Sequence, residues 1–200
     1  MISYNGMEAK ENRNSAASRQ LPAGAYVAGV MDTRIEGTAP DQRLAIRFDI
    51  TEGPYAGFYM DKYRAAKAMG SDYEIKYKGI IKIRIPNPAN KNARYPESDV
   101  NRFNDMIYRF QQSNEGFVWN GDETRLQGLT IGISVQEDEY NGNKFTKPVR
   151  FEIASEVRNG MVSVIPPKNR EAENPTTGPM MDQTSGMQVV STEQLPWDVS

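Results

Sequence analysis

Four cations fall on one side of a short predicted strand. Alternation over residues 77–85 places Ile81, Ile83 and Ile85 on one face, and the opposite face carries no acidic residue. Alternate residues on a strand face lie about 7 Å apart, close to the phosphate spacing of an extended single strand. The row could therefore neutralise phosphates, and an ordinary solvated strand face is the alternative. Its members are Lys76, Lys78, Lys82 and Arg84.

Aromatic residues cluster beside this row. Proteins that bind single strands combine a cationic groove with rings on which bases stack, each stack contributing about 1–3 kcal/mol. We expect Phe58 in the core and Tyr59 and Tyr63 facing outward, because these tyrosines share strand parity with Asp61. Tyr77 is the third expected stacking ring, although its parity groups it with the isoleucines. The predicted nucleic-acid-binding residues are Lys76, Lys78, Lys82, Arg84, Tyr59, Tyr63, Tyr77, Arg47, Lys62, Tyr140 and Arg150.

Charge is distributed unevenly along the chain. All 24 lysines and arginines lie in residues 1–170, and residues 171–200 carry acids and no base, within a net charge of −2. A basic body followed by an acidic tail suits a protein that holds a polyanion and offers its tail to other proteins. The tail closes on an apolar tip, Leu195, Pro196, Trp197 and Asp198, which we interpret as a partner-docking motif. A tryptophan that lies by chance in a disordered end is the alternative.

Several residue types are missing. The chain has no histidine and no cysteine, so it lacks the usual general base, nucleophile and zinc ligands. HExxH, GxxxxGK[ST] and GxSxG are also absent. We therefore expect a protein without enzymatic activity, cofactor or metal. A carboxylate-based magnesium nuclease is a minor alternative, because the acids at 137–139 adjoin a turn signal.

Targeting signals are not visible. No stretch approaches the twenty apolar residues of a membrane span, and the N-terminus lacks the basic start and apolar run of a signal peptide. Together with the lack of cysteine, this predicts no membrane association and a location in the cytoplasm of a bacterial host.

Periodicity predicts the elements that position these residues. The clearest alternation, Leu44 to Ile50, is typical of a half-buried strand, and Asn141-Gly142 is a hairpin signal. Residues 64–73 are compatible with a short helix ending at Gly70. Strands are predicted over residues 26–35, 44–50, 58–63, 77–85, 129–135 and 149–157, with a further short strand over 161–165.

One amphipathic helix is predicted after Pro96. Acids follow in its first turn, and an apolar stripe then recurs at helical spacing until Ser113. We expect this stripe to plug one end of the core. It comprises Val100, Phe103, Met106, Ile107 and Phe110.

A run of strands with one late helix favours a mainly β fold. We predict an OB-like antiparallel Greek-key barrel with one amphipathic helix and disordered termini. The predicted organisation is a flexible arm over residues 1–20, an OB-like domain over 21–165, and a disordered acidic tail over 166–200.

Diffuse motifs along the body carry a family resemblance. Gly24-Ala25-Tyr26, residues 48–57, residues 113–117, and residues 126–132 together with Glu139-Tyr140 resemble bacteriophage and prophage single-stranded DNA-binding-like proteins. The resemblance implies an OB-type core, an acidic tail, and a role in phage replication and recombination. The tip is similar to the acidic Ile/Leu-Pro-Phe ending of bacterial single-stranded DNA-binding proteins, but here Val199 and Ser200 follow it.

These observations predict sequence-tolerant, non-enzymatic binding of single-stranded DNA in phage replication or recombination. The tail would recruit replication or recombination proteins, and assembly into a homo-oligomer is compatible with this role. A phage protein-interaction or assembly module that binds no nucleic acid is the alternative function.

Overall fold

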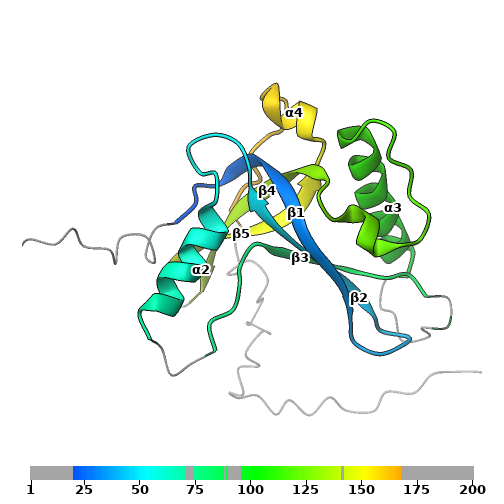
Figure 1. Ribbon diagram of the computed structural model, residues 1–200, viewed down its shortest axis with the longest axis horizontal. Coiled ribbons are helices and arrows are strands. Elements are labelled where there is room, and N and C mark those ends of the chain that lie inside the picture. Colours follow the sequence, from blue (N-terminus) through cyan, green and yellow to red (C-terminus); the bar gives the residue numbers. More distant parts are fainter. Residues whose placement is uncertain (1–19, 71–73, 88, 90–95, 141, 168–200) are drawn as a thin grey trace, which may run out of the picture. The chain divides into compact units, whose positions relative to one another are not determined.

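Five antiparallel strands form one open sheet in the order β3-β2-β1-β4-β5 in the computed structural model (Figure 1). The structure describes residues 20–70, 74–87, 89, 96–140 and 142–167. Its elements are β1 (Gly24–Glu36), β2 (Arg43–Ile50), α2 (Phe58–Ala68), β3 (Ile80–Arg84), α3 (Pro96–Ser113), the 3-10 helix η1 (Glu123–Leu126), β4 (Thr130–Tyr140), β5 (Asn143–Glu152) and α4 (Ala154–Arg158).

The core lies against the inner face of the curved sheet. The alternation of β2 is confirmed: Leu44, Ile46, Phe48 and Ile50 are buried. Burying one apolar side chain of this size contributes about 1.5–3 kcal/mol, which fixes the register of β2 between β1 and β3. The predicted hairpin is confirmed as well, since β4 and β5 pair across the Asn-Gly turn.

The helix predicted after Pro96 is confirmed as α3. Met106, Ile107 and Phe110 are buried, and Phe103 packs partly against the core. Val100, which we expected in the same stripe, is 41% exposed. It lies near the N-terminal end of α3, and the contact with the core begins at Phe103, about one turn later. α3 contacts β3, β4 and β5.

The predicted third strand over residues 58–63 is wrong, because these residues begin helix α2. Asp49, at the end of β2, supplies the missing helix cap. Its Oδ1 accepts a hydrogen bond from the Tyr59 N–H (2.9 Å), and its Oδ2 accepts one from the Met60 N–H (3.0 Å). A carboxylate at a helix N-terminus satisfies free amide donors and opposes the helix dipole. The alanines that follow favour continuation of the helix.

Other boundaries also differ from the prediction. Residues 74–79 have no regular structure, so β3 begins at Ile80 and not at Tyr77. The strand expected over 149–157 begins earlier, at Asn143, and ends at Glu152, where the chain turns into α4. Residues 161–165 contain no strand. The fold therefore has more helices than the one amphipathic helix predicted. The short helix with which residues 64–73 were compatible is present as the second half of α2, which ends at Ala68.

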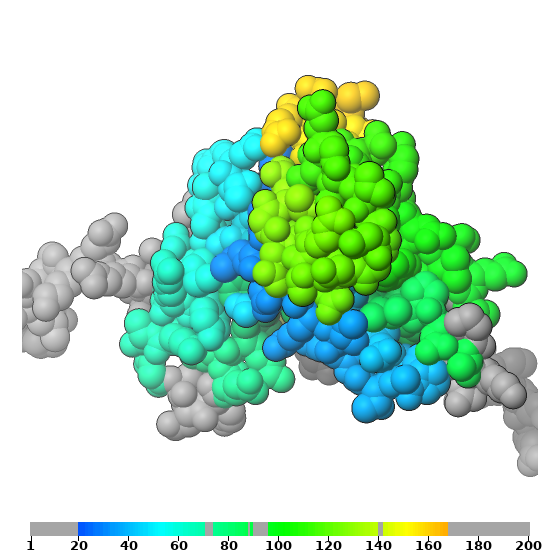
Figure 2. Space-filling model, turned by 45° about the vertical axis from the view of Figure 1, so that its right-hand side comes forward, coloured from blue at the N-terminus to red at the C-terminus, as the bar shows by residue number. Residues whose placement is uncertain are grey.

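A mainly β, antiparallel fold is thus established, but the sheet is open. β3 and β5 form its two edges, and no ladder joins them. Figure 1 shows α2 at the left and α3 at the right of the view, and both helices contribute side chains to one core cluster. In Figure 2 the residues between α3 and β4 (yellow-green) appear between α2 (cyan) and α3 (green). Within the described ranges, no helix is long and apolar enough to cross a membrane.

Candidate nucleic-acid interface

The outer face of β2 and β3 carries the predicted cations of both strands. Arg43 lies opposite Arg84, and Arg47 lies opposite Ile80, one pleat from Lys82. Because cross-strand partners share a face, these cations point to the side opposite Leu44, Ile46 and Phe48. We name Arg43, Arg47, Lys82 and Arg84 the basic sheet face. Arg43 was missed from the sequence, although its spacing of four residues from Arg47 gives it the same parity.

Acids reach this face from neighbouring elements, contrary to the expectation of an acid-free row. Glu36 of β1 pairs with Lys82 at 2.5 Å. Arg84 pairs with Asp41 at 3.3 Å and with Asp99 of α3 at 3.6 Å. The hydrogen bond from Lys82 lowers the pKa of Glu36, so this carboxylate stays ionised. The strand alone could not reveal these acids, because they are distant in sequence.

Tyr77 connects the basic sheet face to α2. Its hydroxyl donates to the Phe48 carbonyl at 2.9 Å, and the Arg47 guanidinium lies 4.8 Å from its ring centroid. Burial raises the pKa of Tyr77, so the phenol remains a neutral donor. Its ring also meets the Tyr63 ring edge-on, with centroids 5.7 Å apart. Cation and aromatic side chains therefore adjoin here, as a single-strand binder requires.

A cavity of about 320 Å³ lies between α2 and the irregular segment that precedes β3. We name it the tyrosine pocket. It brings together five of the predicted residues: two tyrosines and three lysines separated by up to nineteen positions in sequence. One carboxylate also lines it. The lining residues are Tyr59, Lys62, Tyr63, Ala66, Glu74, Ile75, Lys76 and Lys78.

The two tyrosines of the pocket differ in exposure. Tyr63 is half-buried, and the Lys67 ammonium lies 5.0 Å from its ring centroid. Tyr59 is only 5% exposed and packs edge-on against Phe48 and Phe58. The expectation that Tyr59 faces outward is therefore wrong, because strand parity does not apply to residues of a helix. Tyr63, one turn after Tyr59, is the ring that a base could reach.

The three lysines of the pocket lie in different surroundings. Lys76 lies 4.0 Å from Glu74, in an exposed pair. Burial, and then the positive charge of Lys78, lowers the pKa of Lys62. A lowered lysine pKa means that the ammonium is destabilised, and a nearby anion would relieve this strain. The pocket thus places three ammonium groups beside one carboxylate.

A second cavity, of about 510 Å³, opens between β3, α3 and β5. Lys82 and Arg84 lie on its rim together with Arg150, whose guanidinium also pairs with Glu152 at 2.6 Å. Arg150 of β5 therefore lies on the opposite side of this cavity from Lys82 and Arg84 of β3. Arg102 of α3 joins the same rim and was missed, because its helix was interpreted as a core element.

The remaining predicted residues stay partly undescribed. The backbone of Tyr140 ends β4, opposite Asn143, but its side chain lies outside the described part of the structure. The tip Leu195, Pro196, Trp197 and Asp198 lies outside the described residues, as do nearly all of the arm over 1–20 and the tail beyond residue 167. In the ranges that are described, no group of three or more acidic side chains is arranged to hold a metal ion.

No protein-family model matches the chain, and no curated protein matches it. The geometry of the tyrosine pocket and of the basic sheet face is therefore the basis for a functional proposal.

Proposed function

We propose that this chain binds single-stranded DNA without sequence preference, through the tyrosine pocket and the adjoining basic sheet face. The observation that carries the proposal is the tyrosine pocket itself. It gathers Tyr63 and three lysines around one cavity that contains a single glutamate. This combination offers a ring for stacking beside cations for the backbone.

The division of roles follows from the contacts. Lys62 and Lys78 hold a phosphate, because their mutual repulsion falls when an anion lies between them. Tyr63 stacks on one base, and Tyr77 supports its ring from the edge. Arg43 and Arg47 contact the next phosphates along β2. Every base presents a π-face, so stacking of this kind tolerates any sequence.

The strand order supports an OB-like arrangement as part of this proposal. Bringing β3 against β5 would close the order β3-β2-β1-β4-β5 into a five-stranded barrel, with α3 connecting β3 to β4. In OB folds, the face of the second and third strands binds oligonucleotides. In the proposed OB-like arrangement, the basic sheet face would occupy that position.

The biological setting is proposed from the chain's charge distribution and its resemblance to phage proteins. The body binds the single strand during phage replication or recombination, and the acidic tail recruits a replication or recombination protein through Leu195, Pro196 and Trp197. Deletion of residues 171–200 should leave DNA binding intact or tighter, because the deletion removes negative charge, and should abolish recruitment.

A binding titration tests the central proposal. Fluorescence anisotropy of a labelled oligo-dT strand should report binding that weakens with salt, by about 0.7 in log–log slope for each phosphate neutralised. No binding, or a flat response to salt, would refute it. The alternative function, a protein-interaction module, predicts that an unlabelled oligonucleotide leaves the tyrosine and tryptophan fluorescence of the chain unchanged.

A further inference from the structure

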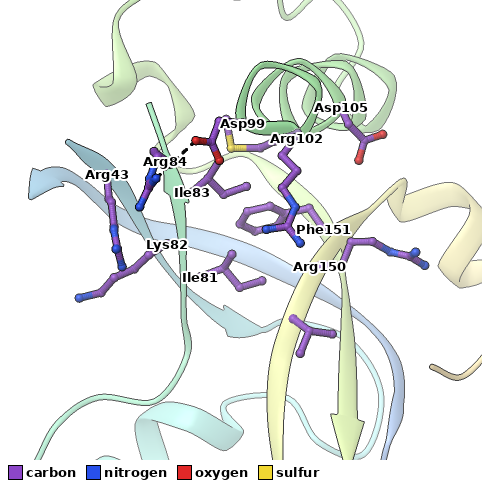
Figure 3. Close-up of a pocket in the computed structure, with 12 residues that line it drawn as sticks. Arg43, Ile81, Lys82, Ile83, Arg84, Asp99, Arg102, Asp105, Arg150 and Phe151 are labelled. Atoms are coloured by element: carbon purple, nitrogen blue, oxygen red, sulfur yellow. Dashed lines mark ion pairs between the residues drawn. The ribbon is translucent and has the colours of Figure 1, made fainter. Parts of the chain in front are cut away.

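The cavity between β3, α3 and β5 combines an apolar floor with a cationic rim (Figure 3). We name it the edge cleft. Figure 3 shows Arg102 reaching from α3 towards Phe151, while Asp99 of the same helix pairs with Arg84. The floor consists of Ile81, Ile83, Met106, Val149 and Phe151, and the rim of Arg43, Lys82, Arg84, Arg102, Arg150, Asp99 and Asp105.

The free edge of β3 lies along this cleft. The Ile85 N–H donates to the Gln42 carbonyl at 2.9 Å, and the Phe48 N–H donates to the Gly79 carbonyl at 2.9 Å. In an antiparallel pair, hydrogen-bonded residues alternate with non-bonded ones. Odd-numbered residues of β3 therefore bond to β2, and the N–H and C=O groups of Lys82 and Arg84 point away from it. In the described part of the chain, β3 has no second strand neighbour.

The charge of the rim favours an anionic ligand. Five cations and two carboxylates line the cleft, and both carboxylates already have partners: Asp99 pairs with Arg84, and Asp105 with Arg109 at 2.8 Å. Three of the cations are paired as well, since Lys82 contacts Glu36, Arg84 also contacts Asp41, and Arg150 contacts Glu152. The excess positive charge therefore comes from the other two. Arg43 and Arg102 have no ion-pair partner among the described residues. The floor, by contrast, is mostly aliphatic, so it suits apolar side chains better than stacked bases.

We propose that the edge cleft binds an extended acidic peptide of a partner protein, which adds as an antiparallel strand to β3. The pleat of β3 determines the pattern of this peptide. Its apolar side chains lie with Ile81 and Ile83 on the floor, and its carboxylates alternate with them and face Lys82 and Arg84. The peptide therefore alternates acidic and apolar residues over about four positions. This site is separate from the tyrosine pocket, but it shares Arg43, Lys82 and Arg84 with the basic sheet face.

The chain's own tail does not fit this description. Residues 171–200 contain no four-residue run in which acids alternate with apolar side chains. Pro196, in the middle of the apolar tip, also lacks the N–H that a strand ladder needs. A partner protein is therefore the occupant that the pattern supports.

The first test uses synthetic peptides and the full chain. A labelled eight-residue peptide in which glutamate alternates with valine should bind at least about tenfold more tightly than a peptide of the same composition with four glutamates followed by four valines. Fluorescence anisotropy at low salt gives both dissociation constants. Equal affinities for the two peptides would overturn the proposal, because charge alone would then explain binding.

N-methylated peptides test strand addition itself. The N–H and C=O groups of Lys82 point into the cleft, so the peptide residue opposite Lys82 would form backbone hydrogen bonds with it. Cross-strand partners place their side chains on the same face of the sheet, so this peptide residue is one of the glutamates that face Lys82. N-methylation of the glutamates should therefore abolish binding, and N-methylation of the valines should preserve it. Loss with both peptides, or retention with both, would contradict addition of a strand to β3.

Charge reversal locates the site. Arg102→Glu should raise the dissociation constant of the alternating peptide about tenfold, because it places a carboxylate on the rim. Arg64→Glu is the matched control: Arg64 is exposed on α2, outside the cleft, and carries the same charge change. Arg102→Glu should weaken oligo-dT binding no more than Arg64→Glu does. Equal loss of DNA and peptide in Arg102→Glu would assign the cleft to the nucleic-acid surface and overturn the peptide proposal.

Discussion

Glutamine at positions 62 and 78 should flatten the salt dependence of DNA binding. Lys62 and Lys78 line the tyrosine pocket, and the positive charge of Lys78 contributes to the lowered pKa of Lys62. If each neutralises one phosphate, the double variant loses about 1.4 from the log–log slope on single strands. Over a fourfold rise in salt, this change amounts to about a sevenfold smaller loss of affinity.

Anisotropy titrations of labelled oligo-dT at several salt concentrations measure this slope. Arg64→Gln is the control, because Arg64 lies on the same helix but does not line the pocket, and removes one charge. Its slope should equal that of the unmodified chain. A double variant with an unchanged slope, or a control that flattens the slope equally, would refute the assignment of phosphate contacts to Lys62 and Lys78.

The protonation of Lys62 gives this prediction a pH dependence. Its pKa is lowered in the free protein, so it loses its proton at a lower pH than an ordinary lysine. DNA affinity should therefore fall as the pH rises through that lowered value, because a neutral amine cannot pair with a phosphate. Lys78→Gln removes the second cause of the shift and should move this loss to higher pH. NMR titration of the lysine side chains measures both effects.

Four further variants test the residues that form and support the site. Gly79→Ala should lower the free energy of unfolding by about 1–3 kcal/mol, as measured by thermal denaturation. A Cβ at this position would lie 2.4 Å from the Phe48 carbonyl oxygen and 2.8 Å from the Tyr59 ring. Stability equal to that of the unmodified chain would contradict this packing. Tyr63→Leu should weaken oligo-dT binding by about 1–3 kcal/mol, whereas Tyr59→Phe should leave it unchanged. Glu36→Gln should tighten DNA binding about threefold, because it frees Lys82 from its ion pair, and it should lower the free energy of unfolding by about 0.5 kcal/mol at neutral pH. Since the pKa of Glu36 is lowered in the folded protein, this difference in stability should vanish as the pH falls through the folded-state pKa. A difference that persists in acid would contradict this assignment.

Patterns within single segments of the sequence predicted strand β2 and helix α3 correctly. The period-two alternation of β2 and the helical stripe of α3 were readable, because burial of one face imposes them. Phe58–Tyr63 was misread because its helix is capped by Asp49, which lies nine residues before the helix begins. A cap of this kind leaves no signal in the helical segment itself.

The composition of the site was predicted better than its geometry. Tyrosines and lysines between positions 59 and 78 were identified, but strand parity placed Tyr59 outside, where the structure buries it. The partners Glu36 and Asp99 reach the basic sheet face through strand pairing and helix packing. Arg102 was hidden for the same reason, since only the fold brings α3 beside β3. Long-range contacts of this kind are not encoded in spacing along one segment.

Mapping the bound strand on the protein tests the central claim most directly. In ¹⁵N NMR spectra of the full chain, addition of oligo-dT should shift amide signals of residues 59–66, 74–84 and 43–47, which form the tyrosine pocket and the basic sheet face. Signals of the α3 residues away from β3 should stay in place. Shifts confined to α3 and β5, or no shifts at saturating oligonucleotide, would contradict the proposed interface.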